Sequence, residues 1–250
     1  MTIQVQTAQT ETASTIDTES GIKPGWVRTG GALGLLSVVL LAGASIAFGG
    51  IGNLRSSSTP AAISSYLATR AASILALTLF TVLGTAIGAW FIATVARVIH
   101  ERDHSSPLGM IALATGAVAT SISAFDGVTL SALVYLHKQG GPTDPALIRV
   151  LFDLQNGLIM PGLFGFFMAA FHVAIGVAMI RGLLARTWVG WLAMVLAALA
   201  AVGAATGLSS VSGGTTIVGY SPVIGYGIIA VITSIYMLRT REPAVPLGAG

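Results

Sequence analysis

Six long, continuous runs of apolar residues fill most of this chain and constrain its fold more than any other feature. About 20 apolar residues are enough for a helix to cross the hydrocarbon core of a bilayer. The runs are too long and too evenly apolar for the strands of a transmembrane barrel, which alternate over ~10 residues. The sequence therefore predicts an all-α fold, a polytopic membrane bundle of six transmembrane helices, over residues 30–50, 71–99, 108–136, 147–180, 188–208 and 218–238.

The composition agrees with a chain that is surrounded by lipid. Hydrophobic residues make up 54% of the 250 residues and charged residues only 8%, whereas soluble domains are about 25% charged. The chain has no Cys, which excludes disulfides, thiolate chemistry and cysteine-ligated metals. Its basic residues lie at the ends of the apolar runs, so the net charge of +3 predicts no nucleic-acid partner. We expect the lipid bilayer as a partner and no cofactor.

The chain divides into one membrane domain and two tails. Residues 1–28 are polar and carry no apolar run, a pattern that is typical of disorder. We predict a disordered cytoplasmic tail over 1–28, a six-helix transmembrane domain over 29–239 and a short cytoplasmic tail over 240–250.

The basic residues predict the orientation of this domain. Eight of them flank the termini and the two loops on the same side, namely Lys23, Arg28, Arg97, Arg102, Arg181, Arg186, Arg239 and Arg241. Four lie on the opposite side, namely Arg55, Arg70, Lys138 and Arg149. Because short cytoplasmic segments carry the excess of Lys and Arg, we expect both termini in the cytoplasm and the protein in the cell inner (plasma) membrane.

The fourth apolar run is too long for one straight crossing. From Leu147 to Ile180 a continuous helix would be about 50 Å long. Pro161 is expected to kink such a helix within the membrane. The alternative is an interfacial first half that ends near Asn156 and is followed by a shorter span.

Asp126 is the most unusual residue of the spans because it is an acid inside the third run. It lies ten residues before Leu136, so about 15 Å below the outer end of a helix. An ionised carboxylate at that depth costs several kcal/mol unless it is paired or hydrated. We therefore predict Asp126 as the first ligand-binding residue and as the candidate catalytic acid. The alternatives are that water reaches it from outside or that it anchors a helix contact.

Other polar residues of the spans are expected at a similar depth. Asp153 and Asn156 enter the membrane from the outer side of the fourth run, and they share a helix face. Tyr220 is expected near the outer end of the sixth helix. Depth matching therefore predicts a polar, outward-facing pocket for a ligand, lined by Ser123, Asp126, Asp153, Asn156 and Tyr220. An ion pair between Arg149 and Asp153 is the alternative role of that acid.

The histidines do not predict a metal or haem site. His172 stands alone in an apolar stretch, and we expect a packed, neutral side chain. His100 and His104 lie near Glu101 and Asp103, where they could bind a metal weakly or form a solvated loop cluster. We predict the loop cluster and no metal.

Small residues are frequent in the spans and predict close helix packing. The chain has 31 Gly, including the pairs Gly84 with Gly88 and Gly203 with Gly207 at a spacing of four. Such faces let helices approach closely in lipid. We expect packing within one chain, with a homo-oligomer or another membrane partner as the alternative.

The start of the fifth run reads Arg186-Thr187-Trp188-Val189-Gly190-Trp191-Leu192-Ala193. A basic residue followed by an aromatic residue, Gly, Trp and Leu resembles a group of uncharacterised six-helix integral membrane proteins of actinobacteria and related bacteria. The resemblance implies the topology and a bacterial membrane, and no activity.

Three functions fit these features. The first is binding or transport of a small or amphiphilic molecule in the outward-facing pocket. The second is an accessory or structural subunit of a membrane complex, which would use the small-residue faces. The third is a membrane-embedded enzyme of the terpene-cyclase type, in which Asp126 is the acid. In that enzyme the cation-stabilising rings would come from Phe125, Phe152, Phe164 and Tyr220.

Overall fold

The computed structural model describes residues 24–49, 59–138, 144–153, 159, 162–209 and 220–239. Every regular element in these ranges is a helix. In chain order they are α1 (Pro24–Gly49), α2 (Pro60–Thr69), α3 (Ala71–Arg102), α4 (Leu108–Lys138), α5 (Pro145–Asp153), α6 (Gly165–Ile180), α7 (Thr187–Ser209) and α8 (Ser221–Leu238). All but α2 and α5 contribute a stretch that is long and apolar enough to cross a membrane. The predicted all-α fold with six spanning helices is confirmed.

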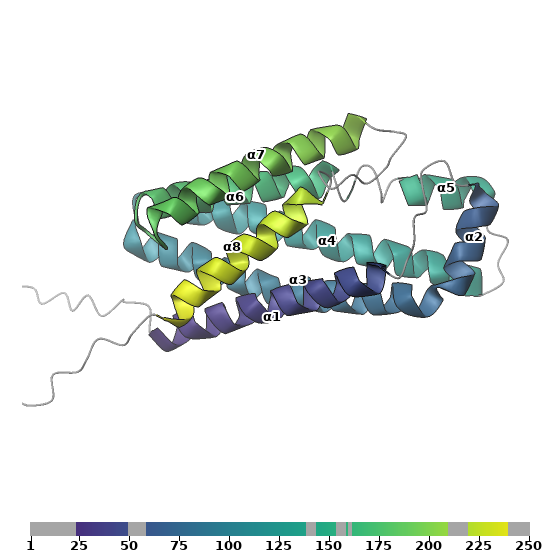
Figure 1. Cartoon of the computed structure of the whole chain (residues 1–250), viewed down its shortest axis with the longest axis horizontal. Helices are drawn as coiled ribbons and strands as arrows, with labels where there is room; N and C mark the ends of the chain where they lie inside the picture. The colour runs from purple at the N-terminus through teal and green to yellow at the C-terminus, as the bar shows by residue number, and fades with distance from the viewer. Residues whose placement is uncertain are drawn as a thin grey trace, which may run out of the picture.

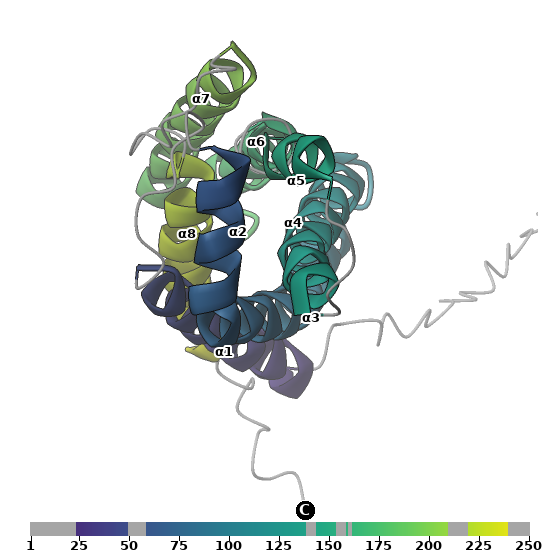
Figure 2. The ribbon, with the colours of Figure 1, turned by 90° about the vertical axis from the view of Figure 1, so that its right-hand side faces the viewer.

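The six spanning helices form a closed ring. In chain order each packs against the next, from α1 to α3, α4, α6, α7 and α8, and α8 packs back onto α1. Figure 2 shows this ring end-on, and Figure 1 shows the helices side by side along the long axis of the molecule. Both ends of the described chain, at α1 and α8, lie at the same end of the bundle (Figure 1). We call this the inner end and the opposite one the outer end, after the predicted orientation.

Glycines allow α1, α3 and α8 to approach closely. A Cβ atom on Gly34 would overlap Ser234, and one on Gly88 would lie 2.8 Å from the Tyr226 hydroxyl. At the same contact the hydroxyls of Ser37 and Tyr226 form a hydrogen bond of 3.2 Å. Small residues therefore join three helices that are not consecutive in the sequence.

The predicted small-residue pair of α3 is used within the chain. A Cβ atom on Gly84 would lie 3.1 Å from Leu41 of α1, and Gly88 faces α1 and α8. Gly203 of α7 is also buried. Packing inside the bundle is thus the role of Gly84 and Gly88, and oligomerisation through small-residue faces stays a prediction.

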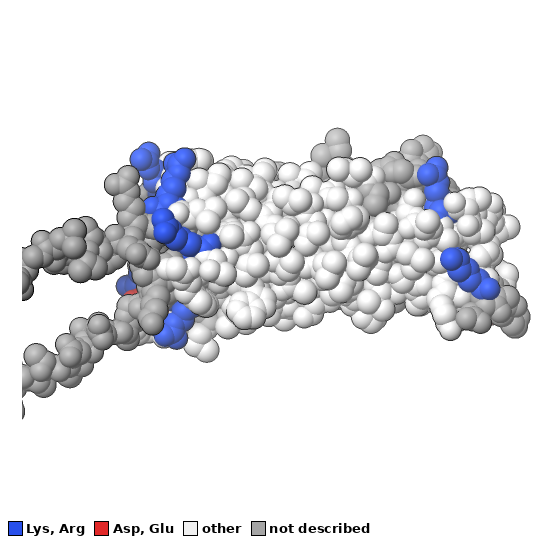
Figure 3. Space-filling view, turned by 90° about the horizontal axis from the view of Figure 1, so that it is seen from below, with Lys and Arg blue, Asp and Glu red and all other residues white. Residues whose placement is uncertain are grey.

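Charged side chains lie at the two ends of the bundle. Figure 3 shows Lys and Arg gathered at both ends, with a surface free of them in between on the face in view. Large apolar side chains such as Trp90 of α3, Val39 of α1 and Val195 of α7 are exposed on the outside of the spanning helices. In the described ranges six basic residues lie at the inner end (Arg28, Arg97, Arg102, Arg181, Arg186 and Arg239) and three at the outer end (Arg70, Lys138 and Arg149). This surface suits lipid on its sides and water at its ends.

The fourth apolar run gives two described helices. They are α5, which ends at Asp153, and the span over Gly162–Ile180, whose first turn over 162–164 is π-helical. The predicted single crossing over 147–180 and the alternative of an interfacial first half differ at residues 154–161, most of which lie outside the described residues, so both stay predictions. The expected kink at Pro161 lies outside the described residues.

A helix that the sequence pattern did not predict lies between the first two spans. Thr59 accepts a hydrogen bond of 3.3 Å from the Ala62 backbone N–H, and Pro60 occupies the first turn. Both features favour the start of a helix. This helix, α2, ends at Thr69. The backbone of the next residue, Arg70 (φ −113°, ψ 13°), leaves the helical region before α3 begins.

These two short helices build a cap on the outer end of the bundle. Figure 1 shows α2 crossing that end at a steep angle to the long axis, with α5 beside it. They share a hydrophobic cluster with the outer ends of α3 and α4, made of Ile63, Leu67, Ala71, Ile74, Leu133, Val134 and Ile148. We call α2, α5 and residues 71–77 and 128–138 the cap.

Candidate functional site

Two hydrophobic clusters stabilise the molecule, one in the cap and one in the inner part of the bundle. The inner cluster contains large side chains that fill the ring, among them Phe91, Ile92, Phe171, Ile175 and Ile229. Because lipid tails are as apolar as these side chains, the cluster stabilises the bundle through close van der Waals packing. The cap cluster lies at the other end of α3 and α4, so the two clusters are separate along the axis.

Between the two clusters, α3 and α4 bury only small or polar residues. On α3 the buried residues that lie between Ile74 and Phe91 are all Thr or Gly, namely Thr81, Gly84, Thr85 and Gly88. On α4 those from Ala119 to Leu133, among the side chains that the structure describes, are Thr120, Ser123, Asp126 and Gly127. We call these eight residues the polar layer.

Asp126 and Ser123 are both buried in this layer. Their exposed fractions are 8% and 5%, and they lie three residues apart on one face of α4. Asp126 is the one residue of the polar layer with a charged side chain. Its carboxyl group can accept hydrogen bonds, balance a cationic group or, when protonated, donate a proton.

Hydroxyl groups tie α3 to α4 beside Asp126. The Thr78 hydroxyl donates a hydrogen bond of 2.8 Å to the Gly127 carbonyl, and the Ser131 hydroxyl donates one of 2.7 Å to Thr78. The hydroxyls of Thr85 and Thr120 instead bond to carbonyls of their own helices. The backbone that carries Asp126 is therefore held in place by contacts between helices.

Close contacts of a glycine place Asp126 along the bundle axis. A Cβ atom on Gly116 of α4 would lie 3.1 Å from the Phe171 ring of α6. These helices run in opposite directions. The span of α6 begins at Gly162, nine residues before Phe171. The residue at the same level on α4 is therefore nine residues after Gly116, which is Phe125. Asp126 lies level with the outer end of α6, where the six-helix ring gives way to the cap.

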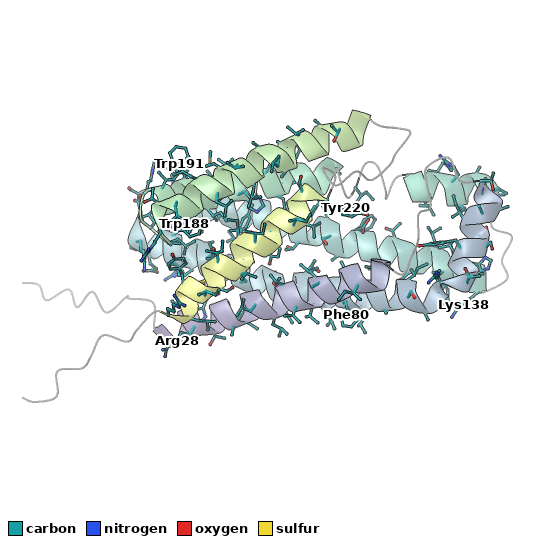
Figure 4. All side chains as sticks on the ribbon, in the orientation of Figure 1. Arg28, Phe80, Lys138, Trp188, Trp191 and Tyr220 are labelled. Atoms are coloured by element: carbon teal, nitrogen blue, oxygen red, sulfur yellow. The ribbon has the colours of Figure 1, made fainter. Side chains whose placement is uncertain are left out.

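Tyr220 is at a similar level on the other side of the ring. It lies six residues before Tyr226, which contacts α1 and α3 beside Gly88. Six residues correspond to about 9 Å toward the outer end, which is the level of the polar layer. Figure 4 shows Tyr220 at the outer start of α8. The predicted match in depth between Asp126 and Tyr220 agrees with this register.

The cap brings a second tyrosine toward Tyr220. Burial raises the pKa of Tyr66 on α2 to about 12, the charge of Arg70 opposes this rise, and Tyr220 adds to it. The two phenols therefore lie near enough for the charge of one to affect the other.

The structure describes only part of the predicted pocket. Ser123 and Asp126 are brought together, and Tyr220 shares their level. Asp153 is the last residue of α5, but its side chain, and with it the alternative pairing with Arg149, lies outside the described features. Asn156 lies outside the described residues altogether.

The sequence analysis missed the contribution of α3 to the site. Thr78, Thr81 and Thr85 follow one another at spacings of three and four, which places them on one face of a helix. This stripe inside an apolar run was the signal that could have revealed them.

Phe125 does not line the polar layer. Its side chain is 59% exposed on the side of α4 away from the ring, so it cannot stabilise a cation beside Asp126. Phe164 is buried at about the level of Ser123 in the register of α4 and α6, and the Phe152 side chain lies outside the described features. Of the four rings that a terpene-cyclase-like enzyme would use, Phe125 is therefore excluded, and the role of the others stays a prediction.

The histidines lie where packing and loop contacts explain them. His172 is fully buried, and its ring edge faces the backbone of Gly225, although neither ring nitrogen meets hydrogen-bond geometry with a described residue. At the inner end the rings of His100 and His104 are tilted to each other with their centroids 5.0 Å apart. The Nε2 atom of His104 lies 3.7 Å from a carboxylate oxygen of Glu101. Within the described ranges no three potential ligands converge on a metal position.

Comparisons with protein-family models, curated protein sequences and solved structures found no match for this chain. The resemblance at 186–193 to a six-helix membrane family therefore stays a prediction. A function for this chain has to be inferred from the residues of the site.

Proposed function

We propose that this multi-pass membrane protein binds or transports a small or amphiphilic molecule, which enters the polar layer from the outer side. The observation that supports the proposal is the buried carboxyl of Asp126 among hydroxyl-bearing residues, between two separate hydrophobic clusters. A chain that needed only stability would continue the apolar packing through this level, because a buried acid costs several kcal/mol in a membrane.

The polar layer suits a ligand with a polar head and an apolar body. Asp126 and Ser123 would bind the head, and the hydroxyls of Thr81 and Thr85 on α3 lie at the same level. Small residues such as Gly84 and Gly127 keep side-chain volume low there. The carboxyl group favours a head that donates hydrogen bonds or carries positive charge.

Equilibrium binding of radiolabelled tetraphenylphosphonium, a lipophilic cation, to the purified protein tests this proposal. We expect saturable binding that Asp126→Asn and Asn156→Ala each weaken at least tenfold, about 1.4 kcal/mol. Asp103→Asn is the matched control because it removes the same charge from the loop at the inner end. A binding isotherm that neither Asp126→Asn nor Asn156→Ala changes would contradict the proposal.

An accessory subunit of a membrane complex is the alternative function. It predicts that a stoichiometric membrane partner co-purifies in mild detergent and that the polar-layer variants leave the complex intact. We propose that both termini are cytoplasmic, which the uneven distribution of the basic residues supports, and that the membrane is the inner (plasma) membrane of a bacterial cell, which the resemblance at 186–193 supports.

A further inference from the structure

Within the described residues α3 and α4 are the longest spanning helices, and their extra length lies in the cap. The apolar stretch of α3 has 32 residues and that of α4 has 31, against 19 for the α6 span and 18 for α8. Because Asp126 is level with the start of the α6 span, the twelve residues from Asp126 to Lys138 extend about 18 Å beyond it. A bilayer that matched only the short helices would leave this length in water.

The outer surface of the extension is not suited to water. Tyr135 on α4 is 63% exposed, and Leu147 and Val150 on α5 are 48% and 61% exposed. The opposite face of α5 is buried in the cap through Ile148. The short helix α5 therefore has an uncovered apolar face as well as a buried one, while Arg149 and Asp153 share a further side of it.

The exposed apolar face continues that of the bundle without a break. On α3 the exposed residues Leu83, Leu79 and Leu75 follow at spacings of four from the ring into the cap. On α4 the same holds from Phe125 and Val128 to Tyr135. A helix that left the membrane at the level of Asp126 would change there from apolar to polar on this face.

On α3 and α4 charged residues appear only at the far end of the cap, whereas α5 carries Arg149 and Asp153 within it. Lys138 ends α4, Arg70 separates α2 from α3, and Asp144 precedes α5. Figure 4 shows Lys138 at the outer limit of the molecule, beside α2. Along α3 and α4 the boundary between apolar and charged surface thus lies at the far end of the cap and not beneath it.

We propose that the cap is seated in the outer leaflet, with Leu147 and Val150 of α5 and the ends of α3 and α4 in contact with lipid. The partner of this surface is the bilayer itself. The exposed face of the cap is continuous with the lipid-facing surface of the ring, and the bilayer accommodates the long helices by thickening or by helix tilt. Tyr135 then lies near the headgroups, a depth at which tyrosine is enriched. This inference does not depend on ligand binding by Asp126.

Because the chain has no Cys, single spin labels can test it. Leu147→Cys and Val150→Cys are labelled with a nitroxide in the full chain in proteoliposomes, and collisions with oxygen and with a water-soluble nickel chelate are compared. Leu79→Cys serves as the lipid reference and Asp144→Cys as the water reference. We expect both α5 labels to collide more with oxygen than with nickel, as at Leu79.

Two outcomes would overturn the proposal. Collision with nickel comparable to that at Asp144 would place the cap in water. Low accessibility to both reagents would mean that protein, such as a second copy of the chain, covers α5. Leu75→Cys on α3 repeats the measurement on another helix of the cap. It decides between lipid and water even if the labels on α5 disturb that short helix.

Discussion

Thr78 of α3 donates a hydrogen bond of 2.8 Å to the carbonyl oxygen of Gly127 on α4, the residue that follows Asp126. This contact holds two long helices in register at the point where the ring meets the cap. Ser131 adds a second bond to the same hydroxyl. The position of the buried acid therefore depends on a hydroxyl of a neighbouring helix.

Thr78→Val should destabilise the bundle because it removes this interhelical hydrogen bond at nearly constant volume. Such bonds in membrane proteins contribute about 0.6 kcal/mol on average and up to about 1.7. Unfolding in mixed micelles of dodecyl maltoside and SDS measures the loss. Thr115→Val is the control, since the Thr115 hydroxyl bonds only to the Ile111 carbonyl of its own helix. Equal losses in both variants would show that the contact with Gly127 contributes nothing.

Gly34→Ala should destabilise the contact of α1 with α3 and α8. The added methyl group would overlap Ser234 and lie 2.5 Å from the Phe91 ring, and overpacking of this kind costs about 1–3 kcal/mol. Gly227→Ala on α8 is the matched control because no atom lies within 4 Å of its added methyl group. The melting temperatures of the two variants in detergent should differ clearly. A Gly34→Ala protein as stable as Gly227→Ala would refute the close packing of these helices.

Tyr66 should make the cap sensitive to alkaline pH. Its pKa is raised from 10.0 to about 12 by burial, so the neutral phenol is favoured in the folded cap. The associated stability is fully present below pH 10 and is lost as the pH rises toward 12. Tyr66→Phe should remove the part of the stability decline between pH 10 and 12 that belongs to this residue, as measured by thermal unfolding at several pH values. An unchanged decline would place Tyr66 in contact with solvent.

Both chain termini should report a cytoplasmic location. Reporter fusions at either end, with green fluorescent protein for the cytoplasm and alkaline phosphatase for the outside, test this prediction in a bacterial host. We expect fluorescence and no phosphatase activity at both ends, because six of the nine described basic residues lie at the inner end. Phosphatase activity at either end would reverse the naming of the inner and outer ends.

The six spans were predictable because the length and apolarity of a run are local properties. Helix α2 was missed because its ten residues carry no long apolar run, and its start at Thr59 and Pro60 was not read as a cap. The order of helices around the ring depends on contacts that no local pattern contains.

A residue of the site was predictable where burying it in the membrane costs much free energy, and it was not predictable where that cost is small. Asp126 is conspicuous in an apolar run, and its depth also indicated Ser123 and Tyr220. Thr81 and Thr85 are ordinary in a membrane helix, because a threonine hydroxyl can bond to its own helix, as that of Thr85 does. The interpretation of Phe125 as a ring beside Asp126 was wrong, since the direction of a side chain around a helix depends on its neighbours.

The unequal helices have a consequence for the membrane around the protein. With the cap in the outer leaflet, as proposed above, lipids beside α3 and α4 meet a taller apolar surface than lipids beside α8, and the bilayer is thickened or the helices are tilted on that side. Mismatch of this kind favours arrangements in which two long flanks share the same lipids. We expect it to draw copies of the protein together through the bilayer without direct contact between them.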